Sequence, residues 1–326
     1  MKARLLLRLT ALLTLAITAS SLAAKAENDL PPLATGGADK TIRLLDSNGK
    51  PMQTFLAHDS EITCLAYSPD GKRLYSGSVD KTIRIWNTED VTMENSLEAN
   101  DKAVLCLSIS TDGKFLSDGG EDCKVRIWNA QTGKLLSTIS AHNKAVKAVA
   151  WSPDGKMLAS GGADRLIQIW KMDGSLVGTI VGHDEAITSL IWSRNGQLLI
   201  SSSADGYIKV WNVADNRLVT RQKAHDKGVV CMALDTEGRG LASAGPDGKI
   251  KIWSFNLTTI VDTNVSIPFD HPVSALAWNL SGKRLVSIGT DKTVRFWNTK
   301  ELATPYKLCT LDGYITSMAL QPETKQ

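Results

Sequence analysis

The segment Ile83-Arg84-Ile85-Trp86-Asn87 decides the fold, because close copies of it recur along most of the chain. Alternation of apolar and polar residues that ends in a large aromatic residue predicts a short β-strand with one buried face. The other copies, spaced 41 to 44 residues apart, begin at Ile42, Val125, Ile167, Ile208, Ile250 and Val294. This period is the length of one four-stranded blade, so the sequence predicts a β-propeller.

Each repeat has the same order of strands and turns. A strand such as Ile62 to Tyr67 leads into the turn Ser68-Pro69-Asp70-Gly71. Proline presets φ for this turn, and glycine supplies the positive φ that closes the hairpin. A second strand such as Arg73 to Ser78 follows, then a tight turn around Asp80, then the tryptophan-bearing strand. A fourth, more variable strand completes the repeat.

The two ends of the repeat array are incomplete in complementary ways. The last innermost strand, Ile315 to Leu320, has no chain after it to finish a blade. The segment from Leu33 to Leu45 has the pattern of second and third strands with no first strand. We therefore predict an all-β, seven-bladed β-propeller over residues 30–322, one domain, with the C-terminal strand paired to the N-terminal strands. This closure removes the unpaired strand edges of an open array.

The first residues have the order of a secretory signal. Lys2, Arg4 and Arg8 form a basic region, and the stretch from Leu9 to Ala19 is apolar. Ala24-Lys25-Ala26 then matches the small-x-small pattern that signal peptidase cleaves.

We accordingly expect a signal peptide over residues 1–26, cleaved after Ala26, with cleavage after Ala23 as an alternative. A retained membrane anchor is a further alternative, although the apolar stretch is short for a bilayer span of about 20 residues. The segment predicts an exported protein, periplasmic or secreted and of bacterial origin, without stable membrane insertion after the signal is removed; a eukaryotic secretory origin is the alternative.

Composition argues against two classes of protein. The net charge is only +3 and no Lys/Arg block occurs, so nucleic acid is not an expected partner. Five cysteines do not form an obvious disulfide framework. Cys64, Cys106 and Cys231 share one position in an apolar strand, where thiols behave as small buried hydrophobes. Disulfides between adjacent blades are the alternative.

These repeats resemble the WD40 family, whose signature is Gly-His before the first strand and Trp-Asp at the end of the third. The resemblance covers nearly all of the chain beyond residue 30 and implies a partner-binding propeller. Blades of this family often contain a buried, hydrogen-bonded tetrad of His, Ser or Thr, Asp and Trp. Carried over by position, the tetrads are His58, Ser76, Asp80 and Trp86; His142, Ser160, Asp164 and Trp170; His183, Ser201, Asp205 and Trp211; and His225, Ser243, Asp247 and Trp253.

Three repeats depart from the tetrad pattern. In one, His271 stands two residues closer to the next strand than its counterparts. The closing repeat has no histidine, and Leu45 replaces its tryptophan. The third such repeat, which ends at Trp128, has Asn100 at the histidine position and Asp118 at the serine position.

That third repeat is also acidic, since Asp101, Glu121 and Asp122 lie in its two neighbouring loops. Crowded carboxylates raise one another's pKa or recruit a cation or a basic group. One interpretation is therefore a functional acidic patch. The other is that Asn100 and Asp118 rebuild the hydrogen bonds with exchanged partners.

The sequence predicts no catalytic residue, cofactor or metal site. All five histidines precede an innermost strand, which leaves little for a general base or a histidine-rich metal site. No nucleophile elbow, phosphate-binding loop, dinucleotide fingerprint or calcium loop occurs. We therefore do not expect an enzyme.

Loops on a rigid scaffold carry function more often than the scaffold itself. The loops that hold the histidines and aspartates present mostly small residues. We expect a protein or peptide partner to contact the exceptions and the acidic repeat, namely Glu61, Val79, Asp101, Asp118, Glu121 and Tyr314. Tyrosine is a frequent anchor of binding hot spots. The predicted function is a non-catalytic scaffold or adaptor in the cell envelope.

Two alternatives stay open at this point. One is a hydrolase acting on a small molecule or sugar at the channel mouth, where carboxylates about 5–10 Å apart would favour it. The other is a structural subunit of a larger envelope complex, which a large exposed apolar patch would favour. Neither the partner nor the oligomeric state follows from the sequence.

Overall fold

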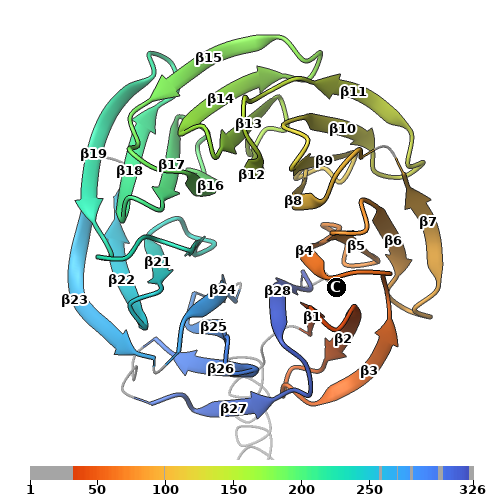
Figure 1. Cartoon of the computed structure of the whole chain (residues 1–326). Coiled ribbons are helices and arrows are strands. Elements are labelled where there is room, and N and C mark those ends of the chain that lie inside the picture. The colour runs from red at the N-terminus through yellow and green to blue at the C-terminus, as the bar shows by residue number, and fades with distance from the viewer. Residues whose placement is uncertain are drawn as a thin grey trace, which may run out of the picture.

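The computed structural model describes residues 32–98, 100–256, 259–269, 271–279, 282–299 and 304–322. The predicted signal peptide and its cleavage site lie outside these residues. Within them, seven four-stranded antiparallel sheets surround a central axis (Figure 1). No helix in these ranges is long and apolar enough to cross a membrane.

Each sheet is one blade, described here from its innermost to its outermost strand. The closing blade contains β28 (Ile315–Leu320), β1 (Leu33–Gly37), β2 (Thr41–Leu45) and β3 (Pro51–Leu56). Blade 2 contains β4 (Ile62–Tyr67), β5 (Arg73–Ser78), β6 (Ile83–Asn87) and β7 (Met93–Leu97). Blade 3 contains β8 (Val104–Ile109), β9 (Phe115–Gly120), β10 (Val125–Asn129) and β11 (Leu135–Ile139). Blade 4 contains β12 (Val146–Trp151), β13 (Met157–Gly162), β14 (Leu166–Lys171) and β15 (Leu176–Val181).

The last three blades continue in the same order. Blade 5 contains β16 (Ile187–Trp192), β17 (Leu198–Ser203), β18 (Tyr207–Asn212) and β19 (Arg217–Lys223). Blade 6 contains β20 (Cys231–Leu234), β21 (Gly240–Gly245), β22 (Lys249–Phe255) and β23 (Ile260–Pro268). Blade 7 contains β24 (Val273–Trp278), β25 (Arg284–Gly289), β26 (Thr293–Asn298) and β27 (Lys307–Thr310).

The ring closes as the repeat pattern predicted. Strand β28 pairs antiparallel with β1, so that Leu33 faces Leu320 and Thr35 faces Met318. Figure 1 shows the blue C-terminal strand beside the red N-terminal strand in one sheet. The predicted seven-bladed all-β fold and its closure are therefore confirmed.

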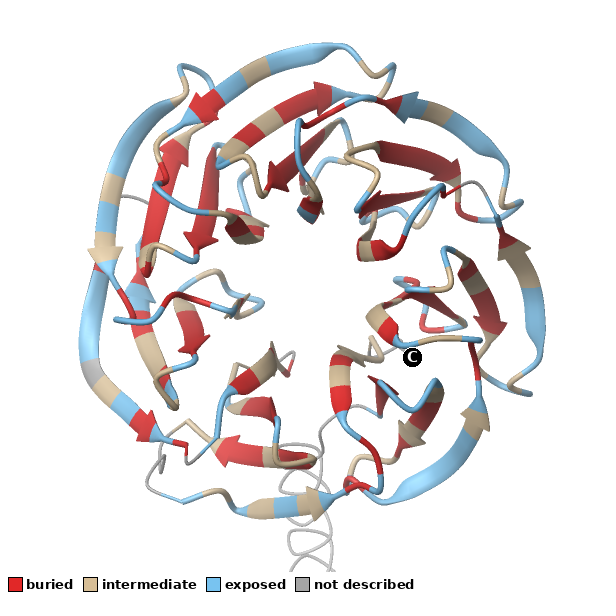
Figure 2. Cartoon of the chain, in the orientation of Figure 1, coloured by how far each residue is buried: buried red, intermediate tan, exposed pale blue. Residues whose placement is uncertain are grey.

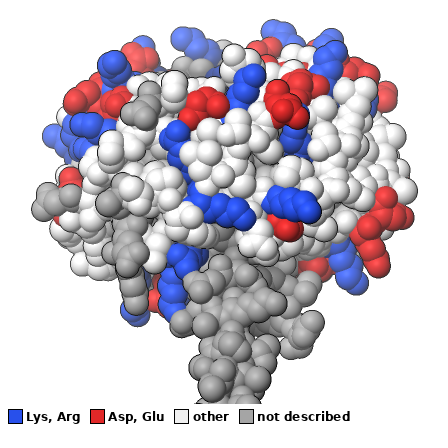
Figure 3. Space-filling model, turned by 90° about the horizontal axis from the view of Figure 1, so that it is seen from below, with Lys and Arg blue, Asp and Glu red and all other residues white. Residues whose placement is uncertain are grey.

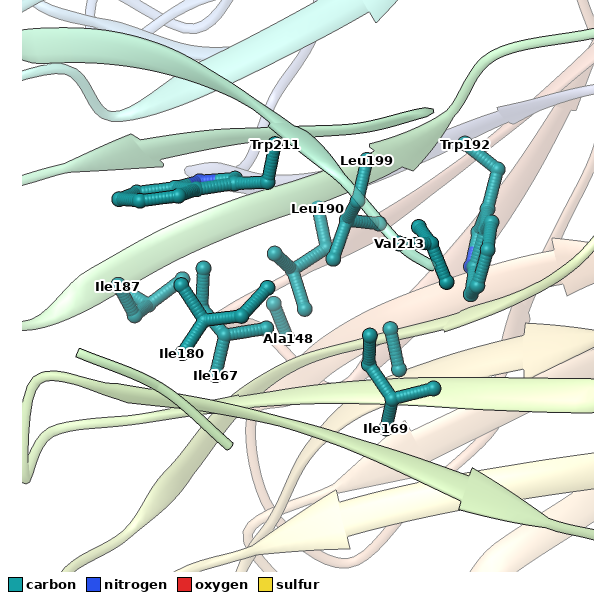
Figure 4. Packing of buried hydrophobic residues seen from close by; sticks show 11 residues of the cluster. Ala148, Ile167, Ile169, Ile180, Ile187, Leu190, Trp192, Leu199, Trp211 and Val213 are labelled. Carbon is teal, nitrogen blue, oxygen red and sulfur yellow. The ribbon is translucent and has the colours of Figure 1, made fainter. Parts of the chain in front are cut away.

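The hydrophobic core is a ring of contacts between blades rather than one central cluster. In Figure 4, Ile167 and Ile169 of blade 4 pack with Leu190, Leu199 and Trp211 of blade 5. Each of the other six clusters likewise joins two neighbouring blades. Burying one such side chain stabilises the fold by roughly 1.5–3 kcal/mol. A blade is thus held in place mainly by its two neighbours.

Close packing of the blades also explains the glycines near the end of the second strand in blades 2, 3 and 4. A Cβ added to Gly161 would lie 2.5 Å from the Ile187 side chain of the next blade. Gly77 and Gly119 meet Val104 and Val146 in the same way. Only glycine allows the blades to approach this closely at these positions.

The outermost strands are the most exposed, and the innermost strands are more exposed than the second strands beside them. Figure 2 shows that the outermost strands are mostly exposed, whereas the second and third strands are mostly buried. This difference accounts for the variable sequence of the fourth strand, because its side chains have few packing partners. Basic and acidic side chains are interspersed on the side of the molecule seen in Figure 3, in line with the small net charge.

Candidate functional site

Two faces of the disc differ in their loops. The loop face, as it is called below, carries the segments before the innermost strands and the turns between second and third strands. The turn face carries the turns between first and second strands. The tetrads lie under the loop face, and the candidate partner-binding residues lie on it.

The tetrad of blade 2 is a continuous chain of hydrogen bonds. Trp86 Nε1 donates to Ser76 Oγ over 2.9 Å. Ser76 Oγ lies 2.7 Å from His58 Nε2, and His58 Nδ1 lies 2.9 Å from Asp80 Oδ2. An ionised carboxylate can only accept, so Nδ1 carries the proton and the serine hydroxyl donates to Nε2. Every member is satisfied, which is the condition for a buried polar network to stabilise.

Blades 4, 5 and 6 repeat this arrangement, with corresponding distances between 2.7 and 3.0 Å. The structure thus brings together all sixteen residues named for the four tetrads. The aspartate also accepts the backbone N–H that follows the histidine, as Asp80 does from Asp59 and Asp164 from Asn143. The tetrad therefore fixes the path of the loop above it.

Burial favours the neutral form of the histidine in three of the four tetrads. Burial lowers the pKa of His58, His142 and His225, although the partner carboxylate opposes this shift. Burial raises the pKa of Asp80, but hydrogen bonds from Thr82 and neighbouring amides outweigh it and hold the pKa at about 2. These groups are fully engaged inside the blade and serve the scaffold.

Three blades lack the histidine, and an arginine replaces it as the aspartate's partner. Each arginine lies four residues after the aspartate, on the tryptophan-type strand. The N–O distances are 2.5, 2.5 and 2.6 Å for the pairs Arg43–Asp39, Arg126–Asp122 and Arg295–Asp291. The sequence analysis missed these pairs. The signal was available, since an arginine occupies this strand position in every repeat without a correctly placed histidine.

In blade 7 the histidine position is filled by Phe269 and not by His271. Phe269 stands 18 residues before Ser287, the separation of His58 from Ser76. It is buried, and the Arg295 guanidinium lies 3.7 Å from its ring centroid. His271 is exposed. The longer loop before this blade therefore carries its histidine outside the blade.

Blade 3 rebuilds the network with exchanged partners. Asp118 Oδ1 accepts from Trp128 Nε1 over 2.5 Å, where other blades use serine. Arg126 donates to Asn100 Oδ1 over 2.5 Å and lies 3.6 Å from Asp118 Oδ2. Burial raises the pKa of Asp118 to about 7, so this carboxyl is not fully ionised at neutral pH.

Asp118 is therefore excluded from the proposed partner-binding residues. Its side chain is fully buried, and the neighbouring Arg126 is only 2% exposed. The reason is the strand register, which directs the second-strand residue of the tetrad into the blade whatever its charge. The remaining residues of the set are all exposed.

The remaining residues lie on three consecutive blades. Tyr314 belongs to the closing blade, Glu61 and Val79 to blade 2, and Asp101 and Glu121 to blade 3. Tyr314 is 60% exposed and Val79 41%. Asp101 is paired with Lys124, with 2.8 Å between Oδ2 and Nζ.

Backbone hydrogen bonds hold these loops in place. The Val79 amide donates to the Glu61 carbonyl over 3.0 Å, and the Ala38 amide donates to the Tyr314 carbonyl over 2.9 Å. Lys292 Nζ lies 4.7 Å from the Tyr314 ring centroid and supports the ring by a cation–π contact. The loop face therefore presents preorganised side chains.

The cysteines and possible metal ligands add no further site to this geometry. All five cysteines are free, so the alternative of disulfides between adjacent blades is wrong. Burial raises the pKa of Cys64 and of Cys231 to about 12, which makes both thiols unreactive. The part of the chain that the structure describes contains no group of three or more His, Cys, Asp or Glu arranged to hold a metal ion.

Two models of known protein families match the sequence of this chain. The family described as IFT122 first beta-propeller matches residues 115–325, and the WD domain, G-beta repeat matches residues 49–87 and 92–129. The chain belongs to this β-propeller family and is built from WD40 repeats. The resemblance inferred from the repeated segment is therefore confirmed for the fold.

The WD40 propeller is also similar to curated fungal proteins over short stretches. It is 51% identical over 55 residues to nuclear distribution protein PAC1 of Gibberella zeae, 17% of this chain and 12% of the relative. It is 51% identical over 59 residues to PAC1 of Tuber melanosporum, with shares of 18% and 13%. It is 45% identical over 65 residues to nuclear distribution protein nudF 2 of Talaromyces marneffei, with shares of 20% and 14%. The chain thus spans 12 to 14% of the length of these relatives.

These relatives overturn the expected location. The prediction of a periplasmic or secreted protein is contradicted, because the relatives are nuclear distribution proteins of fungi. The prediction rested on the order of charged and apolar residues in positions 1–26, a short pattern that says nothing about the repeats. The cell-envelope setting of the scaffold and the bacterial origin lose their support with it.

Proposed function

We propose that the WD40 propeller is a non-catalytic scaffold that binds a protein or peptide partner through its loop face. The contact surface is the arc formed by Tyr314, Glu61, Val79, Asp101 and Glu121. The observation that carries the proposal is the exposed Tyr314 ring on a loop whose backbone is fixed. An exposed, preorganised tyrosine loses little conformational entropy on binding and is a typical interface anchor.

The internal use of the histidines supports a binding role over a catalytic one. Four of the five histidines have both ring nitrogens engaged within their blades. Catalytic acid–base work requires a group that can reach a substrate and exchange a proton with it. The tetrad aspartates are likewise occupied by histidine, arginine and backbone N–H groups. We propose no substrate for this propeller.

The relatives' role in nuclear distribution is not part of the proposal. The matched stretches of 55 to 65 residues are little longer than one repeat of this chain. A match of this length supports the repeat and not a particular partner. The similarity supports a WD40 scaffold and leaves the partner to be found.

The proposal is tested by affinity capture with a matched pair of double variants. Tyr314→Ala/Glu121→Lys alters the loop face, while Met52→Ala/Glu89→Lys truncates another exposed large side chain and makes the same charge reversal, on β3 and in the turn between β6 and β7. Both variants must melt at the wild-type temperature. We expect a partner captured by the wild type and the control to bind the loop-face variant at least about tenfold more weakly once purified. Equal binding by all three proteins would refute the proposal.

A further inference from the structure

Tyr314, the anchor of the proposed loop-face site, lies where the two ends of the propeller meet. It directly precedes β28, and the turn between β1 and β2 lies beside it. The Ala38 amide donates to the Tyr314 carbonyl over 2.9 Å, and Thr316 Oγ1 donates to the Gly36 carbonyl, also over 2.9 Å. Residues 311–314, called the anchor loop below, are therefore held by residues from the opposite end of the propeller.

The closing blade lacks the hydrogen bonds that tie the corresponding loop down in the tetrad blades. Leu311 stands at the position of the histidine, four residues before the innermost strand begins. In blades 2, 4 and 5 the tetrad aspartate also accepts the backbone N–H that follows the histidine. Among the described residues, Asp39 accepts hydrogen bonds only from Thr41 and Arg43. The anchor loop therefore needs another support.

That support is the ion pair between Asp39 and Arg43, which packs against the anchor loop. Arg43 is 7% exposed, and its Nη2 lies 2.5 Å from Asp39 Oδ2. A Cβ added to Gly313 would overlap Asp39 Oδ2 and would lie 3.1 Å from Arg43 Nη2. The loop backbone thus rests on both members of the pair, and only glycine permits this approach.

Arg43 keeps the Asp39 carboxylate in this place. Burial raises the pKa of Asp39, but hydrogen bonds from Arg43 and Thr41 outweigh it and lower the pKa below its ordinary value of 3.8. Arg43 Nη1 also donates to Thr41 Oγ1 over 2.6 Å, so the guanidinium holds both residues of the turn. Without the arginine, the partly buried carboxylate would turn towards water, because burying an unpaired charge is costly. The anchor loop would then lose its support.

Blade 7 supplies a second contact, which involves the Tyr314 ring itself. Lys292, in the turn between β25 and β26, places Nζ 4.7 Å from the ring centroid. The same turn carries the Asp291–Arg295 ion pair, with an N–O distance of 2.6 Å. The ring therefore lies against one turn while its loop rests on another. A displaced anchor loop would change the surroundings of the ring.

We propose that Arg43 is a positioning residue for the loop-face site. By holding Asp39 against Gly313, it keeps the Tyr314 ring in the orientation that a partner contacts. This inference rests on the proposed function of the loop face and assigns the preorganisation of its anchor to one buried side chain. A preorganised anchor binds more tightly because it loses less conformational entropy on binding.

The experiment labels the tyrosines of the full chain with 3-fluorotyrosine and follows Tyr314 by fluorine NMR, with Tyr314→Phe to assign its resonance. Arg43→Met removes the charge from the ion pair. Arg43→Lys keeps the charge but not the planar fork of the guanidinium, and it is the second variant if Arg43→Met does not fold. Arg126→Met is the matched control, because Arg126 is also buried and forms the equivalent 2.5 Å pair with Asp122 in blade 3.

We expect Arg43→Met to shift the Tyr314 resonance or split it into several lines, and Arg43→Lys to shift it less. Arg126→Met should leave the resonance at its wild-type position, although it breaks an equivalent ion pair. An unchanged resonance in the folded Arg43 variants, or an equal change in Arg126→Met, would overturn the proposal.

Binding is measured separately, with the purified partner that the wild type captures. The affinity of the partner should fall about fivefold or more with Arg43→Met, whereas an affinity within about twofold of the wild type would contradict the proposal. The absence of any captured partner would count against the loop-face proposal itself, since the fluorine signal tests the role of Arg43 without one.

Discussion

At the scale of single residues, each blade must supply partners for one aspartate beneath the loop face. Four blades use a histidine that links the aspartate to serine and tryptophan. Three blades use an arginine from the adjacent strand. Only the histidine extends the hydrogen bonds from the aspartate through serine to the tryptophan. The polar interior of this propeller is therefore built to hold loops in place.

Removal of one tetrad aspartate should destabilise the protein measurably. Asp164→Ala leaves His142 Nδ1–H and the Asn143 amide without their acceptor. We expect a loss of about 1–3 kcal/mol in the free energy of unfolding, measured by urea denaturation. The control Asp173→Ala removes an exposed aspartate of the same blade and should change stability by less than about 0.5 kcal/mol. Equal effects of the two substitutions would contradict a structural role for the tetrad.

The buried Asp118 should give stability an unusual dependence on pH. Its pKa is about 7 in the folded protein, above the ordinary value of 3.8. The unfolded chain therefore releases this proton near pH 4, while the folded protein keeps it until about pH 7. The contribution of Asp118 is thus fully present below pH 4 and is lost as the pH rises towards 7.

Asp118→Asn keeps the acceptor for Trp128 Nε1 but cannot ionise. We expect the stability of this variant relative to the wild type to increase between pH 4 and pH 8. Denaturant unfolding at four pH values in that range measures it. A difference between the two proteins that does not change with pH would show that Asp118 is ionised throughout.

At the scale of elements, we expect the closing blade to be the weakest of the seven. It has neither the histidine nor the tryptophan of a tetrad, because Leu311 and Leu45 occupy those positions. The hydroxyls of Thr35 and Ser317 are buried without a hydrogen-bond partner among the described residues. Its innermost strand, β28, is far from β1 in sequence, so only the hydrogen bonds between these two strands join it to the rest of the blade. Opening of the ring should therefore begin between β28 and β1.

Hydrogen exchange followed by mass spectrometry measures this opening directly. Amides of β1 and β28 should exchange before those of β13 and β17 in blades 4 and 5, since local opening follows local stability. Complete tetrads and two intact neighbours protect the latter strands. Uniform exchange across the blades, or earliest exchange in blade 4 or 5, would contradict a weak closing blade.

At the scale of the whole molecule, the repeat period predicted nearly everything that depends on local sequence. Three features predicted seven blades and their closure: Trp86 and its equivalents, the Ser-Pro-Asp-Gly turns, and the incomplete repeats at the two ends of the array. The exposed loop-face residues also followed, since each loop can be placed within its own repeat. Asp118 was misplaced because its acidic character suggested the surface, whereas the strand register directs it inward.

Features shared between blades could not be predicted in the same way. The buried cluster of Ile167 and Ile169 with Leu199 and Trp211 arises where blades 4 and 5 meet, and no single repeat contains it. Phe269 was overlooked because His271 has the expected residue type at the wrong spacing. The location was wrong because it depended on residues 1–26 alone. Fold therefore follows from the repeats, whereas the surfaces depend on how the repeats assemble.

The most direct test of the binding role is site-specific photo-cross-linking in cells that express the full chain. A photoreactive phenylalanine analogue is placed at Tyr314 on the loop face or at Met52 on the rim, in proteins of equal thermal stability. The account predicts one defined protein cross-linked from position 314 and not from position 52. Cross-links only from position 52, or none from position 314, would contradict a partner-binding loop face.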